Sequence, residues 1–184
     1  MTTYAIGLFF HFLGLVGLFV GYGLEWTASS LLGRATSADS ARAALGLYRR
    51  SMPISGPGLL VLIVSGGYLA SVTGGMKQAW ISASLLGIVL ALGIGFVFIL
   101  PRVRRIRAAL PEGNVALPEA ALARLQDPLV VTLIRVRFVL ALGIVYLMTA
   151  KPGSLATALF ILLGAIVIGS LCAASSWTSG RKAP

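Results

Sequence analysis

The sequence predicts an all-α, polytopic transmembrane helix bundle with five spans, and two observations carry this prediction. Hydrophobic residues make up 58% of the 184 residues and charged residues only 11%, whereas soluble domains carry about 25% charged residues. Five apolar stretches are each about 18–22 residues long, which is the length of helix that crosses a hydrocarbon core of about 30 Å. The expected spans are residues 4–24, 56–73, 79–100, 129–150 and 154–173.

The distribution of Lys and Arg predicts how the bundle lies in the membrane. Thirteen of these fifteen residues fall on one side of the five-span topology, and only Lys77 and Lys151 fall on the other. Because basic residues near span ends stay in the cytoplasm, we expect the N-terminus outside and the C-terminus inside a bacterial cytoplasmic (inner) membrane. The same asymmetry accounts for the net charge of +10, so the expected partners are membrane lipids and no nucleic acid.

The residues before and within the first two spans predict an uncleaved anchor, a short loop helix and a bend. The first lacks a basic n-region and a small-residue cleavage site, so we expect it to remain as an anchor. In the inner loop over 25–55, Ser37 or Asp39 is expected to cap a short helix that Pro53 ends. The second span follows Ser55-Gly-Pro-Gly and contains Ser65-Gly-Gly, which predicts a bend or a thin stretch of helix.

Proline and charged residues predict where the third span ends and the fourth begins. Pro101 and the arginines behind it predict a basic amphipathic continuation of the third span on the lipid headgroups, with Arg102, Arg104 and Arg105 as headgroup or anion contacts. Asp127-Pro128 has the pattern of an N-cap followed by proline, opening the fourth span. With an inner loop over 101–128 and two very short outer connections, we expect residues 1–184 to form a single bundle.

No residue pattern predicts catalysis. The sequence has no phosphate-binding loop, no paired Cys or His ligands, no nucleophile motif, and a single cysteine, Cys172. We therefore expect no enzyme activity and no metal site. All five acids are expected outside the membrane core, which argues against a proton- or sodium-coupled carrier. They are Glu25, Asp39, Glu112, Glu119 and Asp127.

His11 is the only histidine and lies inside the first span. At 100° per residue it shares one helix face with small residues and with Glu25. In one interpretation His11 is the axial ligand of a haem or chlorin-type pigment, with a second ligand from another chain or from a methionine such as Met148 or Met52. In the other, the glycines admit a neighbouring helix and His11 hydrogen-bonds across the contact. The other members of this face are Gly7, Gly14, Leu18, Gly21 and Tyr22.

Small residues recur at four-residue spacing in two further spans, which favours close helix packing within the bundle or docking of a partner subunit. These are Gly87, Ala91 and Gly95 in the third span and Ala165, Gly169 and Ala173 in the fifth. Arg135 and Arg137 lie two to three turns into the fourth span. We expect them to extend to the inner headgroups, with a clamp on a lipid phosphate or a cofactor propionate as the alternative.

Several motifs together resemble a bacterial family of small predicted integral-membrane proteins of the domain-of-unknown-function type. They are His11 in a Gly-rich first span, Ser65-Gly-Gly-Tyr-Leu-Ala, Arg135-Val-Arg and Met148-Thr-Ala-Lys-Pro-Gly. The resemblance covers most of the chain and implies a four- or five-helix bundle in the bacterial inner membrane. The first-span histidine is more loosely similar to that of small haem-pathway and copper-resistance membrane proteins, which usually carry further histidines.

Three functions remain open from the sequence. The favoured one is a non-catalytic accessory or assembly subunit of a larger respiratory or photosynthetic membrane complex, because the outer loops are minimal and small-residue stripes could dock other helices. The second is a haem- or pigment-handling protein that uses His11. The third is a small-solute or lipid transporter, suggested by the Gly-interrupted second span.

Overall fold

Five long helices carry the architecture in the computed structural model, which describes residues 3–73, 77–111, 117, 125 and 127–180, with backbone only at 175–180. All five are long and apolar enough to cross a membrane, and the described residues form no strand. The all-α prediction with five spans is confirmed. The elements are α1 Thr3–Leu32, α2 Ala38–Val72, α3 Ala79–Gly93 with η2 Ile94–Ile99 and α4 Leu100–Ala108, α6 Pro128–Ala150, and α7 Leu155–Gly180.

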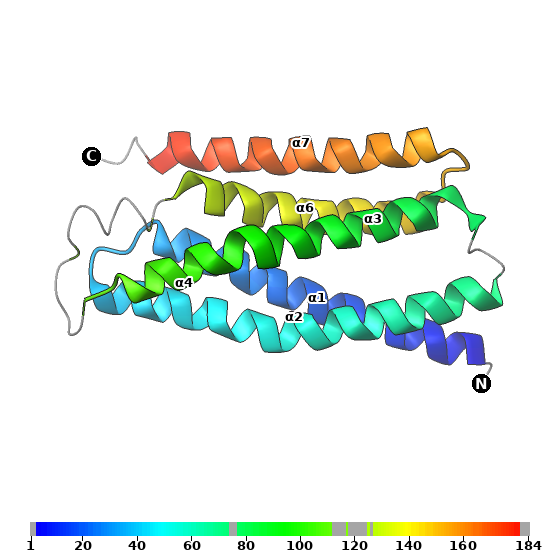
Figure 1. Ribbon diagram of the computed structural model, residues 1–184, viewed down its shortest axis with the longest axis horizontal. Helices are drawn as coiled ribbons and strands as arrows, with labels where there is room; N and C mark the ends of the chain where they lie inside the picture. The colour runs from blue at the N-terminus through cyan, green and yellow to red at the C-terminus, as the bar shows by residue number, and fades with distance from the viewer. Residues whose placement is uncertain (1–2, 74–76, 112–116, 118–124, 126, 181–184) are drawn as a thin grey trace.

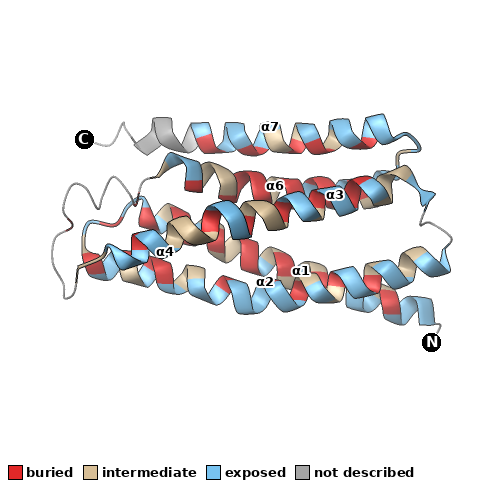
Figure 2. Cartoon of the chain, in the orientation of Figure 1, coloured by how far each residue is buried: buried red, intermediate tan, exposed pale blue. Residues whose placement is uncertain are grey.

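The helices lie lengthwise beside one another, and α6 is the central one (Figure 1). α1 and α2 are antiparallel and form the most extensive helix pair, whereas α6 contacts α1, α3, η2 and α7. α7 packs mainly on α6 and α3. Buried residues line the faces between helices (Figure 2), so the polar groups on the inner faces of α1, α2 and α6 are brought together.

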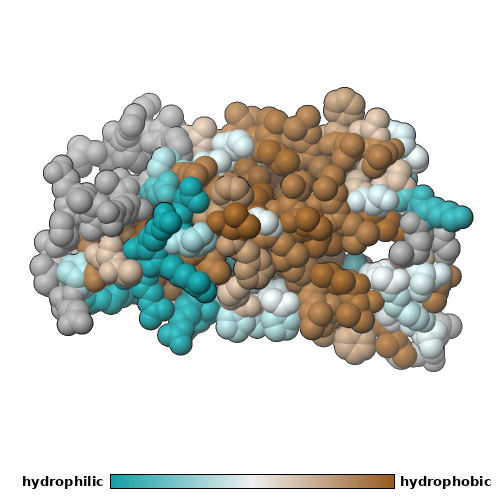
Figure 3. Space-filling model, in the orientation of Figure 1, coloured by the Kyte–Doolittle hydropathy of each residue, from teal (hydrophilic) through white to brown (hydrophobic). Residues whose placement is uncertain are grey.

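The outward faces of the helices are apolar, as expected of a protein surrounded by lipid. Phe9, Val64 and Phe160 are among many large hydrophobic side chains that are more than half exposed. A broad hydrophobic band covers the middle of the molecule in Figure 3. A water-soluble monomer rarely exposes so large an apolar surface.

Basic side chains gather at the end of the bundle where α1 ends, α2 and α6 begin, and α4 lies (Figure 3). Lys77 and Lys151 lie at the opposite end, after α2 and α6. The charge asymmetry in the sequence is therefore an asymmetry in space. The described members of the basic end are Arg34, Arg42, Arg49, Arg50, Arg102, Arg104, Arg105 and Arg107.

α2 runs continuously through Pro53 and Pro57, which corrects the expectation that Pro53 ends a short helix. Each proline lacks the N–H that would bond a carbonyl one turn earlier, but close packing against a neighbouring helix holds such a segment helical. Ser37 is the N-cap, and it forms a reciprocal capping box with Ser40. The inner loop expected over 25–55 is thus helical except at residues 33–37.

The third span contains a π-helical turn, η2, where the sequence predicted only continuous helix. Leu100 N–H bonds the carbonyl of Gly95, five residues back. Pro101 follows at once, and its ring would clash with a carbonyl in a regular α-helical turn. The wider turn relieves that clash and places Gly95 toward α6. Beyond it the arginine-rich segment continues as α4, as predicted, and Asp127 caps α6 by accepting from Leu129 N–H at 2.9 Å.

Candidate functional site

A buried ion pair joins α1 to α6 inside the bundle. Arg137 Nη1 donates to Glu25 Oε2 at 2.8 Å, and the two residues are 9% and 4% exposed. Glu25 lies seven residues before the end of α1, and Arg137 nine residues after the start of α6, which is roughly 10–14 Å along each helix. Glu25 is therefore buried inside the protein within α1, where the sequence placed it at the start of an inner loop, and Arg137 pairs with it instead of extending to the surface. That all five acids lie outside the membrane core stays a prediction.

Hydroxyl and aromatic groups complete this polar centre, by which we mean Tyr22, Glu25, Tyr48, Ser51 and Arg137. Ser51 Oγ lies 3.2 Å from Glu25 Oε1 and 2.7 Å from the carbonyl oxygen of Tyr48, so its one proton is shared between them. The Arg137 guanidinium carbon lies 4.2 Å from the centroid of the Tyr22 ring, within the range of a cation–π contact. The centre thus joins α1, α2 and α6.

Gly95 of η2 lies directly against the arginine. A Cβ built on Gly95 would lie 2.9 Å from Arg137 Cζ, so any larger residue would displace the guanidinium. The small-residue stripe of the third span therefore leaves room for a charged side chain at this level. π-Helical turns occur frequently at functional sites, and this one forms a wall of the polar centre.

The polar centre adjoins a cavity of about 70 Å³. Arg137 Nε is buried and has no hydrogen-bond partner among the described residues. An unpartnered buried donor is costly, and a cavity beside it offers a place for the missing acceptor. The lining residues come from α1, α2, α3, η2, α4 and α6 and include Glu25, Tyr48, Ser51, Ser55, Leu92, Gly95 and Arg137.

His11 lies on the same face of α1 but about 20 Å from Glu25 along the helix. Its Nδ1 is 3.2 Å from Ser65 Oγ, and Ser65 Oγ donates to the carbonyl of Val61 at 2.5 Å. His11 therefore bonds across the contact between α1 and α2. In the neutral tautomer with the proton on Nδ1, Nδ1 donates to Ser65 Oγ and Nε2 keeps a lone pair.

The glycines of α1 bring α2 against it. A Cβ on Gly14 would lie 2.7 Å from the carbonyl oxygen of Gly58, and one on Gly21 would lie 2.5 Å from Ser55 Cβ. A Cβ on Gly7 would likewise lie 2.8 Å from the Tyr68 ring. Since α2 itself occupies this face, the glycines do not open a space for a macrocycle.

The other stripes also face into the bundle. A Cβ on Gly87 would meet Ile144 at 2.9 Å, and one on Gly169 would meet Val136 Cα at 2.6 Å. Ala91 and Ala165 are 5% and 6% exposed. These small residues are used in packing between helices of this chain and are not presented to a partner.

Comparison with known proteins places the chain in a family. Residues 8–152 match the model of a family described as predicted integral membrane protein (DUF2269). The chain belongs to this family. The matched segment contains the whole polar centre and His11, whereas α7 lies beyond it. No curated protein and no solved structure matches.

In this DUF2269 protein the other arginine of the fourth span, Arg135, also turns toward α1. Arg135 is 4% exposed, and its guanidinium carbon lies 3.6 Å from the centroid of the Trp26 ring. Nη2 donates to Ser30 Oγ at 2.8 Å, and Nη1 approaches the carbonyl oxygen of Trp26 at 3.4 Å. Arg135 and Arg137 thus take separate partners on one helix, and a lipid or propionate contact remains a prediction.

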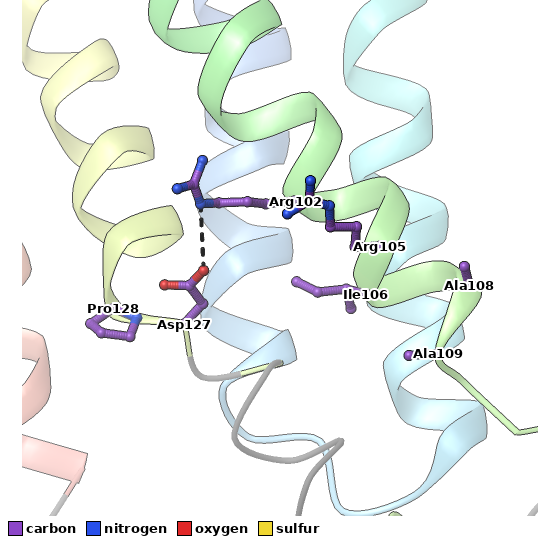
Figure 4. Close-up of a pocket in the computed structure, with 7 residues that line it drawn as sticks. All are labelled: Arg102, Arg105, Ile106, Ala108, Ala109, Asp127 and Pro128. Atoms are coloured by element: carbon purple, nitrogen blue, oxygen red, sulfur yellow. Dashed lines mark ion pairs between the residues drawn. The ribbon is translucent and has the colours of Figure 1, made fainter.

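The basic end holds a second, more open cavity of about 700 Å³ (Figure 4). Arg102 and Arg105 line it, and Arg102 Nε lies 3.7 Å from Asp127 Oδ2. Arg104 is exposed but is not among its lining residues. Two of the three predicted headgroup arginines therefore share one surface with the carboxylate that caps α6.

The described residues contain no group of three or more His, Cys, Asp or Glu side chains that could hold a metal ion. Met52 lies thirteen residues before Ser65, the partner of His11, which is about 20 Å along α2. Met148 packs with residues of α3, α6 and α7. Neither methionine is placed beside His11 as a second axial ligand.

Sequence reasoning missed the pairing of Glu25 with Arg137. The signal was present in part, because Glu25 shares the glycine face of α1 and Arg137 lies at a similar depth in the fourth span. What the sequence does not contain is the rotation of α6 that turns Arg137 toward α1. Without knowledge of that rotation, the positions of Glu25 and Arg137 near span ends are typical of side chains that extend to the membrane–water interface.

Proposed function

We propose that this protein is a non-catalytic, multi-pass protein of the bacterial cytoplasmic membrane that binds a small polar solute at the Glu25–Arg137 centre and lets it cross. The observation that carries the proposal is a buried charged pair inside the bundle, with an unpartnered Arg137 Nε beside a cavity. Ionisable groups at such positions commonly mark solute or ion pathways.

Burial energetics support a binding role over a purely structural one. Moving two charges out of water costs several kcal/mol per ion, and a well-packed apolar pair often stabilises a fold at least as well. A bundle with extensive apolar helix contacts gains little stability from Glu25 and Arg137. A site for a polar solute, in contrast, needs fixed charges in a dry environment, where electrostatic interactions are strong.

A buried carboxylate also favours transport. Glu25 is 4% exposed and lies inside the bundle beside Arg137, and coupled carriers generally use a buried ionisable group of this kind. We further propose the orientation that the charges predict, with the basic end of the bundle in the cytoplasm. The arginines of that end would then attract anionic solutes toward the centre from the cytoplasmic side.

A solute-entry assay tests the proposal. Purified protein in lipid vesicles is mixed with an osmotic gradient of urea, glycerol or sodium nitrate, and light scattering follows the entry of each solute. We expect protein-dependent entry of at least one solute, and a tenfold or greater loss of that entry in Arg137→Gln. Asp127→Asn is the matched control, because it alters an ion pair outside the centre. Equal entry in the Arg137→Gln and wild-type proteins would contradict the proposal.

A second candidate function is haem or pigment binding, favoured by one observation. His11 Nδ1 lies 3.2 Å from Ser65 Oγ, and in the tautomer where Nδ1 donates to that oxygen the Nε2 lone pair can ligate a metal, as in histidines oriented by a partner on the other ring nitrogen. This candidate concerns a different level of the bundle from the polar centre, so the two functions can be tested independently.

An accessory or assembly role in a larger respiratory or photosynthetic complex remains a proposal with reduced support. Its first argument was that small-residue stripes dock partner helices, but Gly87, Ala91 and Gly169 pack within this chain. Its remaining support is the lack of a catalytic residue pattern in the sequence and the two short outer connections expected near residues 74–78 and 151–153. Purification in mild detergent from the native membrane, with identification of co-purifying subunits, tests this role.

A further inference from the structure

The pocket beside Arg137 has room for a small solute. Its volume is about 70 Å³, whereas roughly 10–15 Å³ is enough to hold one water. Its lining includes the exposed residues Met52, Gly56 and Phe96. The pocket therefore opens to the surface of the bundle, and a solute can enter it.

The donors of Arg137 indicate the chemistry of the occupant. A guanidinium has five N–H donors in a planar fork and no acceptor. Nη1 is bonded to Glu25, and Nε is buried without a partner among the described residues. A planar oxyanion is the acceptor that best matches such a fork. A neutral molecule would satisfy the free donor without using the positive charge.

Glu25 determines what must accompany the anion. The pair is neutral as it stands, so an anion entering alone would leave two negative charges beside one positive charge in a poorly solvated site. Two close like charges favour protonation of one of them. If Glu25 takes up one proton on a carboxylate oxygen as the anion pairs with Arg137, the centre stays neutral. Ser51 Oγ, 3.2 Å from Glu25 Oε1, can hydrogen-bond to either form of the carboxyl group.

We propose that the polar centre takes a small, planar, monovalent oxyanion together with one proton, with Arg137 binding the anion and Glu25 holding the proton. This inference rests on the proposed function and names its substrate class. No bond other than that of the transferred proton forms or breaks, and the net charge of the occupied centre equals that of the empty one.

Nitrate is the probe that tests it, because it is planar, monovalent and crosses lipid poorly by itself. Vesicles containing the protein and a luminal pH dye receive an inward nitrate gradient, and valinomycin with equal potassium on both sides holds the membrane potential at zero. We expect nitrate entry with acidification of the lumen. In Arg137→Gln we expect both to fall at least tenfold, and in Glu25→Gln we expect the acidification to be lost.

Two further variants keep the test interpretable if a charge substitution unfolds the protein. Leu92→Phe reduces the cavity from α3 without altering a charge and should also slow nitrate at least tenfold. Asp127→Asn should leave nitrate entry with acidification at least as fast as in the wild type, because it removes a negative charge beside Arg102. Circular dichroism and size-exclusion chromatography establish that each variant is folded.

The outcomes separate this inference from the proposed function. Arg137-dependent entry of urea or glycerol without nitrate would overturn the oxyanion class and leave the proposed function standing. Nitrate entry without acidification in the wild type would overturn the proton. If no solute enters in an Arg137-dependent way, both proposals fail.

Discussion

Arg137 Nη1 and Glu25 Oε2 are 2.8 Å apart although 112 residues separate them in the chain. The contact ties the central helix, α6, to α1, and Ser51 connects it to α2. It is a buried contact between opposite charges in a bundle where many close helix contacts are made by glycines and apolar side chains. Substitutions of Glu25 and Arg137 can therefore test separately what the ion pair contributes to stability and what it contributes to function.

Breaking the pair on one side should destabilise the protein strongly. We expect Glu25→Ala to lower the free energy of unfolding by about 3–5 kcal/mol, because Arg137 is left as an uncompensated buried charge. Glu25→Leu combined with Arg137→Met should unfold close to the wild type, since both charges are gone. Denaturant unfolding in detergent measures both. A double variant as unstable as Glu25→Ala would show that the charges themselves hold the bundle.

Closing the contact between α1 and α2 should also be costly. A Cβ on Gly58 would lie 2.8 Å from the backbone nitrogen of Leu18, so we expect Gly58→Ala to cost about 1–3 kcal/mol through overpacking. Gly46 is the matched control on the same helix, with no atom within 4 Å of its Cβ position. Gly46→Ala should stabilise by about 0.5–1 kcal/mol. Equal thermal midpoints for the two variants would contradict the packing described for this interface.

Cysteine labelling tests the orientation of the bundle. Two variants are made in a Cys172→Ala background, each with one exposed glycine replaced by cysteine. Gly46→Cys lies near the basic end of the bundle, and Gly153→Cys lies at the opposite end. We expect a membrane-impermeant maleimide added to intact cells to label Gly153→Cys only. Labelling of Gly46→Cys alone would reverse the orientation, and disruption of the cells should expose both sites.

A visible absorption spectrum tests the haem candidate at His11. Titration of the purified protein with haemin should give a shifted Soret band, and His11→Ala should abolish the shift. Ser65→Ala removes the hydrogen-bond partner of His11 Nδ1 and should weaken haem binding about 10–100-fold. A spectrum that is the same in the wild type and His11→Ala would exclude His11 as the ligand.

The fold followed from the sequence because its determinants are local. The five apolar spans, a cap at Ser37 or Asp39 and the Asp127-Pro128 start of α6 depend on residues close together in the chain, and all three were predicted. The helices α1 and α2, at 30 and 35 residues, are longer than the predicted spans. The continuation of α2 through Pro53 was not, because it depends on packing against α1. The π-helical turn at Gly95 has a local cause in Pro101. It also has a cause distant in the chain, because the Arg137 guanidinium packs against Gly95 and leaves no room for a larger residue.

The polar centre was less accessible to sequence reasoning for a physical reason. An arginine two to three turns into a span can extend to the headgroups or turn inward to a carboxylate, and only the rotation of its helix decides between them. Arg135 and Arg137 are two residues apart, yet one stacks on Trp26 and the other bonds Glu25. Both side chains contact α1, although residues two apart leave a helix in different directions.

Solute entry by the double variant Glu25→Leu with Arg137→Met tests most directly whether the pair serves binding or only folding. The account predicts a folded protein, close to wild type in unfolding, that reconstitutes into vesicles but admits the Arg137-dependent solute at least tenfold more slowly. A folded double variant that admits this solute at the wild-type rate would contradict the claim that the Glu25–Arg137 centre is the functional site.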